Sequence, residues 1–162
     1  MPDKSTQECA AMVMGTIPLV MRSVGAEMKK RRSSDFTVRQ FHTLMIVKHE
    51  ESPSISLVAE HLGATLSAAS KLADGLVQCG YLTRETDSRD RRRIILALTE
   101  SGKAELESAH MDALAYVGEI LEKLSPSECA MIKLGMELLR SVFAPALAAK
   151  PKSDTRKEGR AP

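Results

Sequence analysis

Apolar side chains recur every three or four positions through most of this chain, which is the pattern of amphipathic helices. The pattern is clear between Gln7 and Arg32, where Met14 and Ile17 begin an apolar stripe. Pro18 interrupts the stripe, so we expect this helix to kink or restart there. Further helices are predicted from Thr37 to a break at 50–53, and at 56–62, 66–79, 104–123 and 126–144. In the last of these, the side chains expected to face inward are Ile132, Met136, Leu139, Val142 and Phe143.

Sequence signals mark where several of these helices begin and end. Thr37 followed by Gln40 forms a capping box at the start of the second helix. Ser56 is expected to cap the short third helix, which Gly63 ends. Further starts are expected at Thr65, at Thr99, and at a second capping box formed by Ser125, Pro126 and Glu128.

The spacing changes at Gly80 from helical to alternating. Residues 81–86 and 93–98 predict two strands joined by a polar turn. Two short helices joined across 63–65 have the shape of a helix-turn-helix, and a hairpin directly after them defines a winged helix. The expected fold is therefore mainly α, with a two-stranded wing and additional helices at both ends of the chain.

The predicted helix at 66–79 has two chemically different faces. One face is spaced to meet the core and holds Leu66, Ala69, Ala73, Leu76 and Val77. The other is small and polar, and short side chains let a helix N-terminus approach the bases in a major groove about 12 Å wide. We expect DNA contacts from Thr65, Ser67, Ala68, Ser70 and Lys71. An ordinary solvated helix surface is the alternative interpretation of this face.

The hairpin turn concentrates cations at the tip of a projecting element. Four arginines lie within five positions, at Arg89, Arg91, Arg92 and Arg93. The guanidinium group matches the oxygens of a phosphate, and each phosphate neutralised adds about one unit to the salt dependence of binding. The alternative is a solvated turn whose arginines pair with Glu85, Asp87 and Asp90.

Composition narrows the cellular setting. The formal net charge of +2 is weak evidence for an anionic partner, so the clustering of arginines has to decide. Cys9, Cys79 and Cys129 are widely spaced and form no CxxC pair, which favours a reducing cytoplasm, with Cys79 and Cys129 expected to be buried. We see no signal peptide and no apolar run near the ~20 residues of a transmembrane helix. No motif indicates an enzyme, a cofactor or a metal site.

From residue 37 to residue 102 the chain resembles the DNA-binding lobe of the MarR (multiple antibiotic resistance regulator) family. The turn reads DSRDRRR, and Asp87, Arg89 and Arg92 fall on the family's DxRxxR wing motif. The resemblance implies that Arg89 reaches into the minor groove while Asp87 and Arg92 brace the wing. Ser88 stands where the family commonly has proline, a small departure expected to loosen the turn.

The resemblance includes the helix before the wing, which reads LSAASKLADGLVQCGYL and carries Ser70 and Lys71 at the family's polar and basic pair. It implies one domain over 1–149, with a lobe at 34–100, dimerisation helices at 7–32 and 101–145, and a tail at 150–162 whose composition reads as basic and disordered. A homodimer agrees with the apolar stripes, and an intrachain bundle is the alternative. The implied function is a cytoplasmic repressor of a pseudo-palindromic duplex operator, relieved by a small molecule.

Relatives in this family suggest how such a regulator is switched. A small aromatic or anionic effector would contact Met21, Arg22, Arg39, His42 and Met45, although a methionine-rich stripe is also typical of core. An oxidant sensor would use Cys9, and a zinc site would use His42 and His110, but neither set has the usual companion residues. A winged helix that binds a protein partner instead of DNA is the alternative function.

Overall fold

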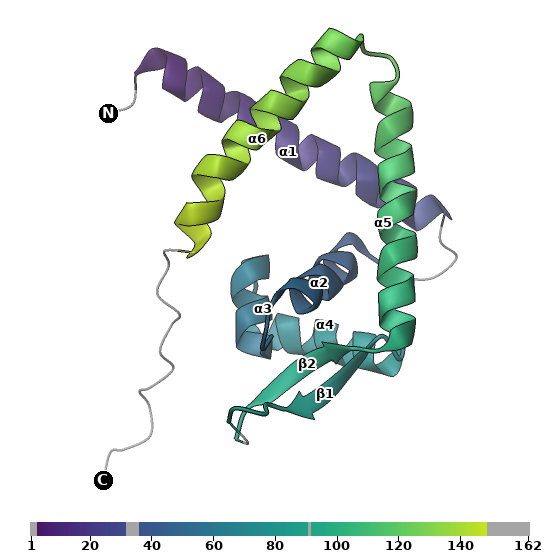
Figure 1. The fold of residues 1–162 in the computed structure, drawn as a ribbon. Helices are drawn as coiled ribbons and strands as arrows, with labels where there is room; N and C mark the ends of the chain where they lie inside the picture. Colours follow the sequence, from purple (N-terminus) through teal and green to yellow (C-terminus); the bar gives the residue numbers. More distant parts are fainter. Residues whose placement is uncertain (1–2, 32–35, 91, 149–162) are drawn as a thin grey trace. The chain divides into compact units, whose positions relative to one another are not determined.

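The computed structural model describes residues 3–31, 36–90 and 92–148. They form two compact units, residues 1–118 and residues 119–162, which are described separately. The elements are α1 (Lys4–Arg31), α2 (Val38–His49), α3 (Ile55–Leu62), α4 (Leu66–Gln78), β1 (Leu82–Thr86), β2 (Ile94–Leu98), α5 (Glu100–Leu121) and α6 (Pro126–Ala148) (Figure 1). The predicted fold, mainly helical with one two-stranded wing, is confirmed. The predicted single domain remains a prediction, and Arg32, Arg91 and the tail at 150–162 lie outside the described residues.

The core of the first unit lies where α2, α3 and α4 meet the hairpin and the start of α5. Leu44, Val58, Leu76, Leu96 and Leu106 come from five different elements, and each is at most 1% exposed. Full burial of an aliphatic side chain stabilises a fold by about 1.5–3 kcal/mol. These side chains therefore fix how α4 and the hairpin sit on the rest of the lobe.

The predicted helix starts hold at the second and fourth helices but not at the third. Thr37 and Gln40 form the expected capping box, and the Thr65 hydroxyl accepts the N–H of Ala68 at 3.2 Å. Ser54, rather than Ser56, caps α3, because its hydroxyl accepts the N–H of Leu57 at 3.2 Å. The earlier start brings Ile55, which is half-buried, into the helix on the same side as the buried Val58 and Ala59.

Gly63 ends α3 as predicted. Its φ of 58° lies in the left-handed region, where a residue without a Cβ is least strained. The short connection to Thr65 then redirects the chain into α4, which completes the helix-turn-helix.

The hairpin is tied to the body of the lobe at both strands. β1 and β2 pair antiparallel, from Leu82 opposite Leu98 to Thr86 opposite Ile94. The N–H of Leu96 donates to the carbonyl of Pro53 at 2.8 Å, so the loop before α3 extends the pairing beyond β2. The hairpin is therefore an anchored element, and its turn lies at the end away from α5 (Figure 1).

A tight joint connects the base of the hairpin to α5. The Thr99 hydroxyl donates to the carbonyl of Gly80 at 2.6 Å and accepts the N–H of Gly102 at 2.9 Å, while the Thr99 N–H donates to the carbonyl of Tyr81 at 3.1 Å. A Cβ on Gly102 would lie 2.0 Å from that Tyr81 oxygen. The predicted cap at Thr99 is confirmed, and it also joins α5 to the turn at the end of α4.

The predicted interruption of the first helix at Pro18 is wrong in one respect, because α1 does not restart there. It runs unbroken from Lys4 to Arg31. A proline removes only one backbone bond, and the carbonyl it leaves, on the exposed Met14, can be hydrated. In the same unit, the Ser23 and Tyr116 hydroxyls share a hydrogen bond of 2.6 Å, which connects α1 to α5.

One helix bears on the expectation that no apolar run approaches the length of a transmembrane helix. By length and composition alone, α1 qualifies, with an 18-residue window of mean hydropathy 1.5 that is not buried. The apolar run is not continuous, because any 18 consecutive residues of α1 include the charged side chain of Glu8 or Arg22. A helix apolar on several sides is equally typical of one buried in a protein interface.

In the second unit, α6 begins with the predicted capping box. The Ser125 hydroxyl accepts the N–H of Glu128 at 3.3 Å, and the Glu128 carboxylate accepts the N–H of Ser125 at 2.8 Å. The helix continues to Ala148, past the predicted end near Pro145. Of the side chains predicted to face inward, only Leu139 is half-buried; those that are exposed instead are Ile132, Met136, Val142 and Phe143.

Candidate nucleic-acid interface

The buried and exposed faces of α4 largely follow the sequence prediction. Ala69, Ala73 and Leu76 are fully buried, and Val77 is half-buried. Small or polar side chains occupy the opposite side, where Thr65, Ser67, Ala68 and Lys71 are exposed and Ser70 is half-buried. The predicted binding residues at the start of α4 therefore share one accessible surface.

Leu66 is the exception, because it was predicted to face the core and is 57% exposed. Its angular position on the helix is the expected one, three residues before the buried Ala69. It is, however, the first residue of α4, and the core does not extend over that end of the helix.

A shallow hollow of about 610 Å³ lies in front of the N-terminus of α4. Three elements form it, since α3, α4 and β2 each contribute side chains. Its lining contains hydroxyls, aliphatic groups and one cation: Ser54, Ile55, Ser56, Leu66, Ser67, Ser70, Lys71 and Ile94. The hollow thus offers hydrogen-bonding groups and a positive charge with no acidic side chain in its lining. The sequence prediction missed the α3 serines and Ile94, because nothing local indicates that α3 and β2 meet α4 here.

Asp87 organises the wing from the inside. It is 2% exposed, and its carboxylate accepts the backbone N–H of Arg89 at 2.9 Å. Arg93 Nη1 lies 3.8 Å from the other carboxylate oxygen, and the N–H of Asp87 donates to the carbonyl of Arg93 at 2.9 Å. Asp87 therefore holds the turn from within, and the arginine beside its carboxylate is Arg93.

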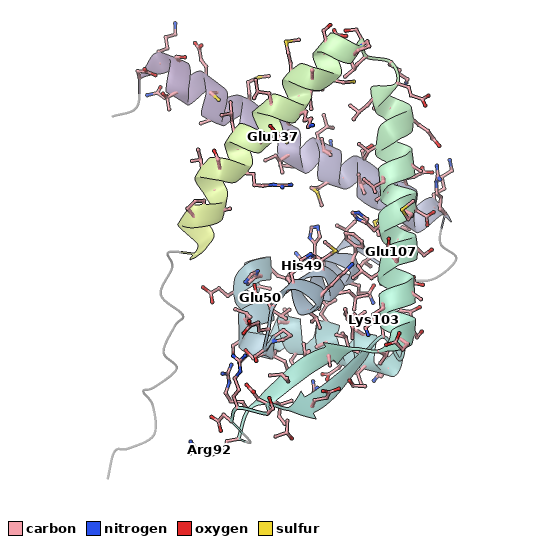
Figure 2. All side chains as sticks on the ribbon, viewed as in Figure 1. His49, Glu50, Arg92, Lys103, Glu107 and Glu137 are labelled. Carbon is pink, nitrogen blue, oxygen red and sulfur yellow. The ribbon has the colours of Figure 1, made fainter. Side chains whose placement is uncertain are left out.

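Arg92 lies at the tip of the hairpin, away from the helices (Figure 2). Its guanidinium is exposed, 3.5 Å from Asp90, whose carboxylate also accepts the backbone N–H of Arg92 at 3.0 Å. That backbone bond is the main cause of the lowered pKa of Asp90. The alternative of local ion pairs in the turn is thus partly realised, although ion pairs this exposed contribute little to stability.

Arg89 extends from the wing to the loop after α2. Its Nη2 lies 3.1 Å from the carboxylate of Glu51, and both side chains are largely exposed. A second cross-element pair joins Arg84 of β1 to Asp74 of α4, which ties the wing to that helix. Sequence patterns gave no signal for either pair, because the partners come from separate elements.

The residues predicted to bind an effector lie on α1 and α2. Arg22 and Arg39 are exposed, while Met21, His42 and Met45 are half-buried. Desolvation lowers the pKa of His42 below 6.5. Their role in ligand binding remains a prediction.

The candidate metal and redox residues show ordinary surroundings. His110 stacks on Phe41, with ring centroids 6.4 Å apart, and the tilted ring of His42 lies 6.0 Å from the same Phe41 ring. Within the part of the chain that the structure describes, no three His, Cys, Asp or Glu side chains gather as a metal site would require. The three cysteines are free thiols; Cys9 is exposed, and Cys79, predicted to be buried, is exposed as well because it follows the last turn of α4.

Comparison with known proteins connects this geometry to a family. Residues 34–93, which hold α2, α3, α4, β1 and the turn before β2, match the model of the MarR family. YfiV of Bacillus subtilis (strain 168), an uncharacterised HTH-type transcriptional regulator, is 30% identical over 105 residues, which cover 65% of this chain and 66% of YfiV, just under two thirds of its length. The HTH-type transcriptional repressor MdtR of the same organism is 25% identical over 126 residues, covering 77% of this chain and 81% of MdtR.

Solved structures share the fold over most of the chain. RV1404 from Mycobacterium tuberculosis superposes with a TM-score of 0.73 at 20% identity, over 89% of this chain and 97% of RV1404. FabT of Streptococcus pneumoniae, solved in complex with DNA, has a TM-score of 0.65 at 22% identity, over 87% of this chain and 99% of FabT. The helices outside the lobe therefore belong to the same architecture as the lobe itself.

Proposed function

We propose, since the chain belongs to the MarR family, that this transcriptional regulator is a dimeric, sequence-specific DNA-binding repressor. The observation that carries the proposal is the pairing, on one lobe, of an accessible α4 N-terminus with an arginine-tipped hairpin braced by a buried aspartate. The relatives with similar sequences are named as regulators of transcription, and two of them as repressors.

In this proposal α4 enters the major groove. Ser67, Ser70 and Lys71 meet base edges and phosphates, and the helix N-terminus donates N–H groups to the backbone. Arg89 and Arg92 contact the flanking backbone and minor groove from the wing tip. Arg91 is expected to join them. Asp87 is too deeply buried to contact DNA and acts by holding the turn in shape.

A second copy of the chain would cover the apolar surface of the outer helices. Large apolar side chains are exposed on α1 and α6, including Met12, Met14, Leu19, Met131, Leu134, Leu138 and Val142. Exposed apolar side chains repeated along a helix in this way indicate a protein interface. A two-fold dimer would present two α4 helices ~34 Å apart to a pseudo-palindromic operator. It would also make α1 part of a soluble cytoplasmic particle rather than a membrane anchor, which fractionation of cell lysates would test.

Relief of repression by a small aromatic or anionic molecule completes the proposal. The half-buried Met21, His42 and Met45 offer soft apolar contacts, and the exposed Arg22 and Arg39 offer charge. Oxidation of Cys9 is a second route, for which its exposure on α1 is the supporting observation.

Titration of the purified full-length protein against the duplex beside its own gene, at two salt concentrations, tests DNA binding. We expect Arg89→Ala to weaken binding and to lower the slope of log affinity against log salt by about one unit. Arg140→Ala removes the same charge from an exposed position on α6 and should leave the slope unchanged. Ser70→Ala should alter the preference among sequences.

The same titration separates the alternative function, a protein-binding winged helix. Absent binding, or binding that is insensitive to salt, would support that alternative and contradict ours, since phosphate contacts require counterion release.

A further inference from the structure

An exposed leucine occupies the position where the proposed DNA-reading helix begins. Leu66 is the first residue of α4 and is 57% exposed. It shares the hollow of about 610 Å³ with Ser67, Ser70 and Lys71, the residues best placed to contact bases. Leaving a large apolar side chain in water costs free energy, so Leu66 would gain stability from an apolar partner in the hollow.

Duplex DNA offers one apolar group in the major groove. Thymine carries a C5-methyl there, whereas the other base edges present hydrogen-bond donors and acceptors. The hollow has the matching composition, because hydroxyls and a lysine surround the exposed aliphatic side chains of Leu66 and Ile94, and its lining contains no carboxylate that would repel phosphate. A purely apolar ligand would leave the serines and Lys71 without partners.

We propose that Leu66 is a specificity-determining residue that packs against a thymine methyl group in each half of the operator. This inference rests on the proposed DNA-binding function and deepens it, by naming a base feature that α4 reads through an apolar contact. Ile94, on β2, lines the same hollow and adds a second exposed aliphatic side chain to it.

The test removes only the methyl group. A duplex recovered from a random pool by the wild-type dimer is resynthesised with deoxyuridine in place of thymidine at one symmetric pair of positions at a time. Loss of one buried methyl is expected to weaken binding about fourfold per half-site, or roughly 16-fold for the symmetric pair. Leu66→Ala should bind the thymine and uracil duplexes equally well at those positions, while Ser67→Ala should retain the difference.

The outcomes distinguish a failure of this inference from a failure of the proposed DNA-binding function. If the wild type binds duplex DNA but no uracil substitution changes affinity by more than about twofold, Leu66 does not read a methyl group. If the uracil penalty persists in Leu66→Ala, another residue makes the contact, and the inference is equally wrong. If the wild type recovers no duplex at all, the DNA-binding function itself fails. Because Leu66 lies outside the core, the variant is expected to keep the wild-type melting temperature, which confirms that it is folded.

Discussion

Substitution of Gly102 by alanine tests the joint that connects α5 to the wing. A Cβ at this position would lie 2.0 Å from the carbonyl oxygen of Tyr81, 2.8 Å from its carbonyl carbon and 3.1 Å from its Cα. These are backbone atoms, so no flexible side chain can move aside. The oxygen would have to retreat by more than an ångström to reach the 3.4 Å at which ordinary contact begins.

The cost follows from that displacement. Forcing an extra carbon into a packed site costs about 1–3 kcal/mol. Moving the Tyr81 carbonyl also weakens the hydrogen bond that it accepts from the N–H of Thr99 at 3.1 Å, a loss of about 1 kcal/mol. The better helix propensity of alanine returns up to about 1 kcal/mol. We expect Gly102→Ala to lower the free energy of unfolding by about 1–3 kcal/mol.

Gly118→Ala is the matched control, because it makes the same change on the same helix where no atom lies within 4 Å of the new Cβ. It should raise the free energy of unfolding by up to about 1 kcal/mol. Thermal melts should therefore separate the two variants by roughly 4–16 °C. The melts are run at one fixed protein concentration, because the stability of a dimer depends on concentration. Equal melting temperatures would show that the joint is loose and would refute this description of it.

Three further predictions concern the wing and one histidine. Asp87→Ala should reduce DNA affinity at least tenfold while most of the lobe stays folded by circular dichroism, because a buried carboxylate that holds the turn is lost; unchanged binding would show that Arg93 and the turn need no brace. Glu51→Gln should strengthen DNA binding a few-fold in low-salt titrations, because it frees Arg89 from a competing carboxylate, and weaker binding would contradict this. Desolvation lowers the pKa of His42 in the folded state, so the unfolded chain binds more protons below pH 6.5, and stability falls as the pH drops from there toward the folded-state pKa. His42→Gln should therefore reduce the loss of melting temperature between about pH 7.5 and 5.5. An unchanged loss would show that other groups cause it.

The features predicted correctly from sequence are those set by bonds between near neighbours. The Thr37 capping box closes within four residues, Gly63 meets a local backbone requirement, and the two strands are consecutive in the chain. Each of these features depends on residues that are close together in the sequence. The polar face of α4 follows from helical spacing for the same reason.

The errors arise where the outcome depends on what another element covers. Leu66 has the spacing of a core residue, but the lobe does not reach the end of α4, and Cys79 is exposed for the equivalent reason at the other end. Ser54 and Ser56 are both adequate caps, and the choice depends on bringing Ile55 onto the packed side of α3. The Arg93 brace and the Glu51 contact of Arg89 join groups that no periodicity relates.

The ties around the hairpin bear on how the proposed interface would gain affinity. The backbone of the wing is held at Pro53, at Thr99 and from within by Asp87, and Arg84 joins it to α4 through Asp74. Ordering an interface on binding costs about 0.5–1.5 kcal/mol for each long side chain that is immobilised. Because the hairpin is already anchored, that cost falls on the arginine side chains and not on the backbone of the wing. Loosening an anchor should therefore weaken every sequence alike, whereas changing Leu66 or Ser70 should change which sequence is preferred.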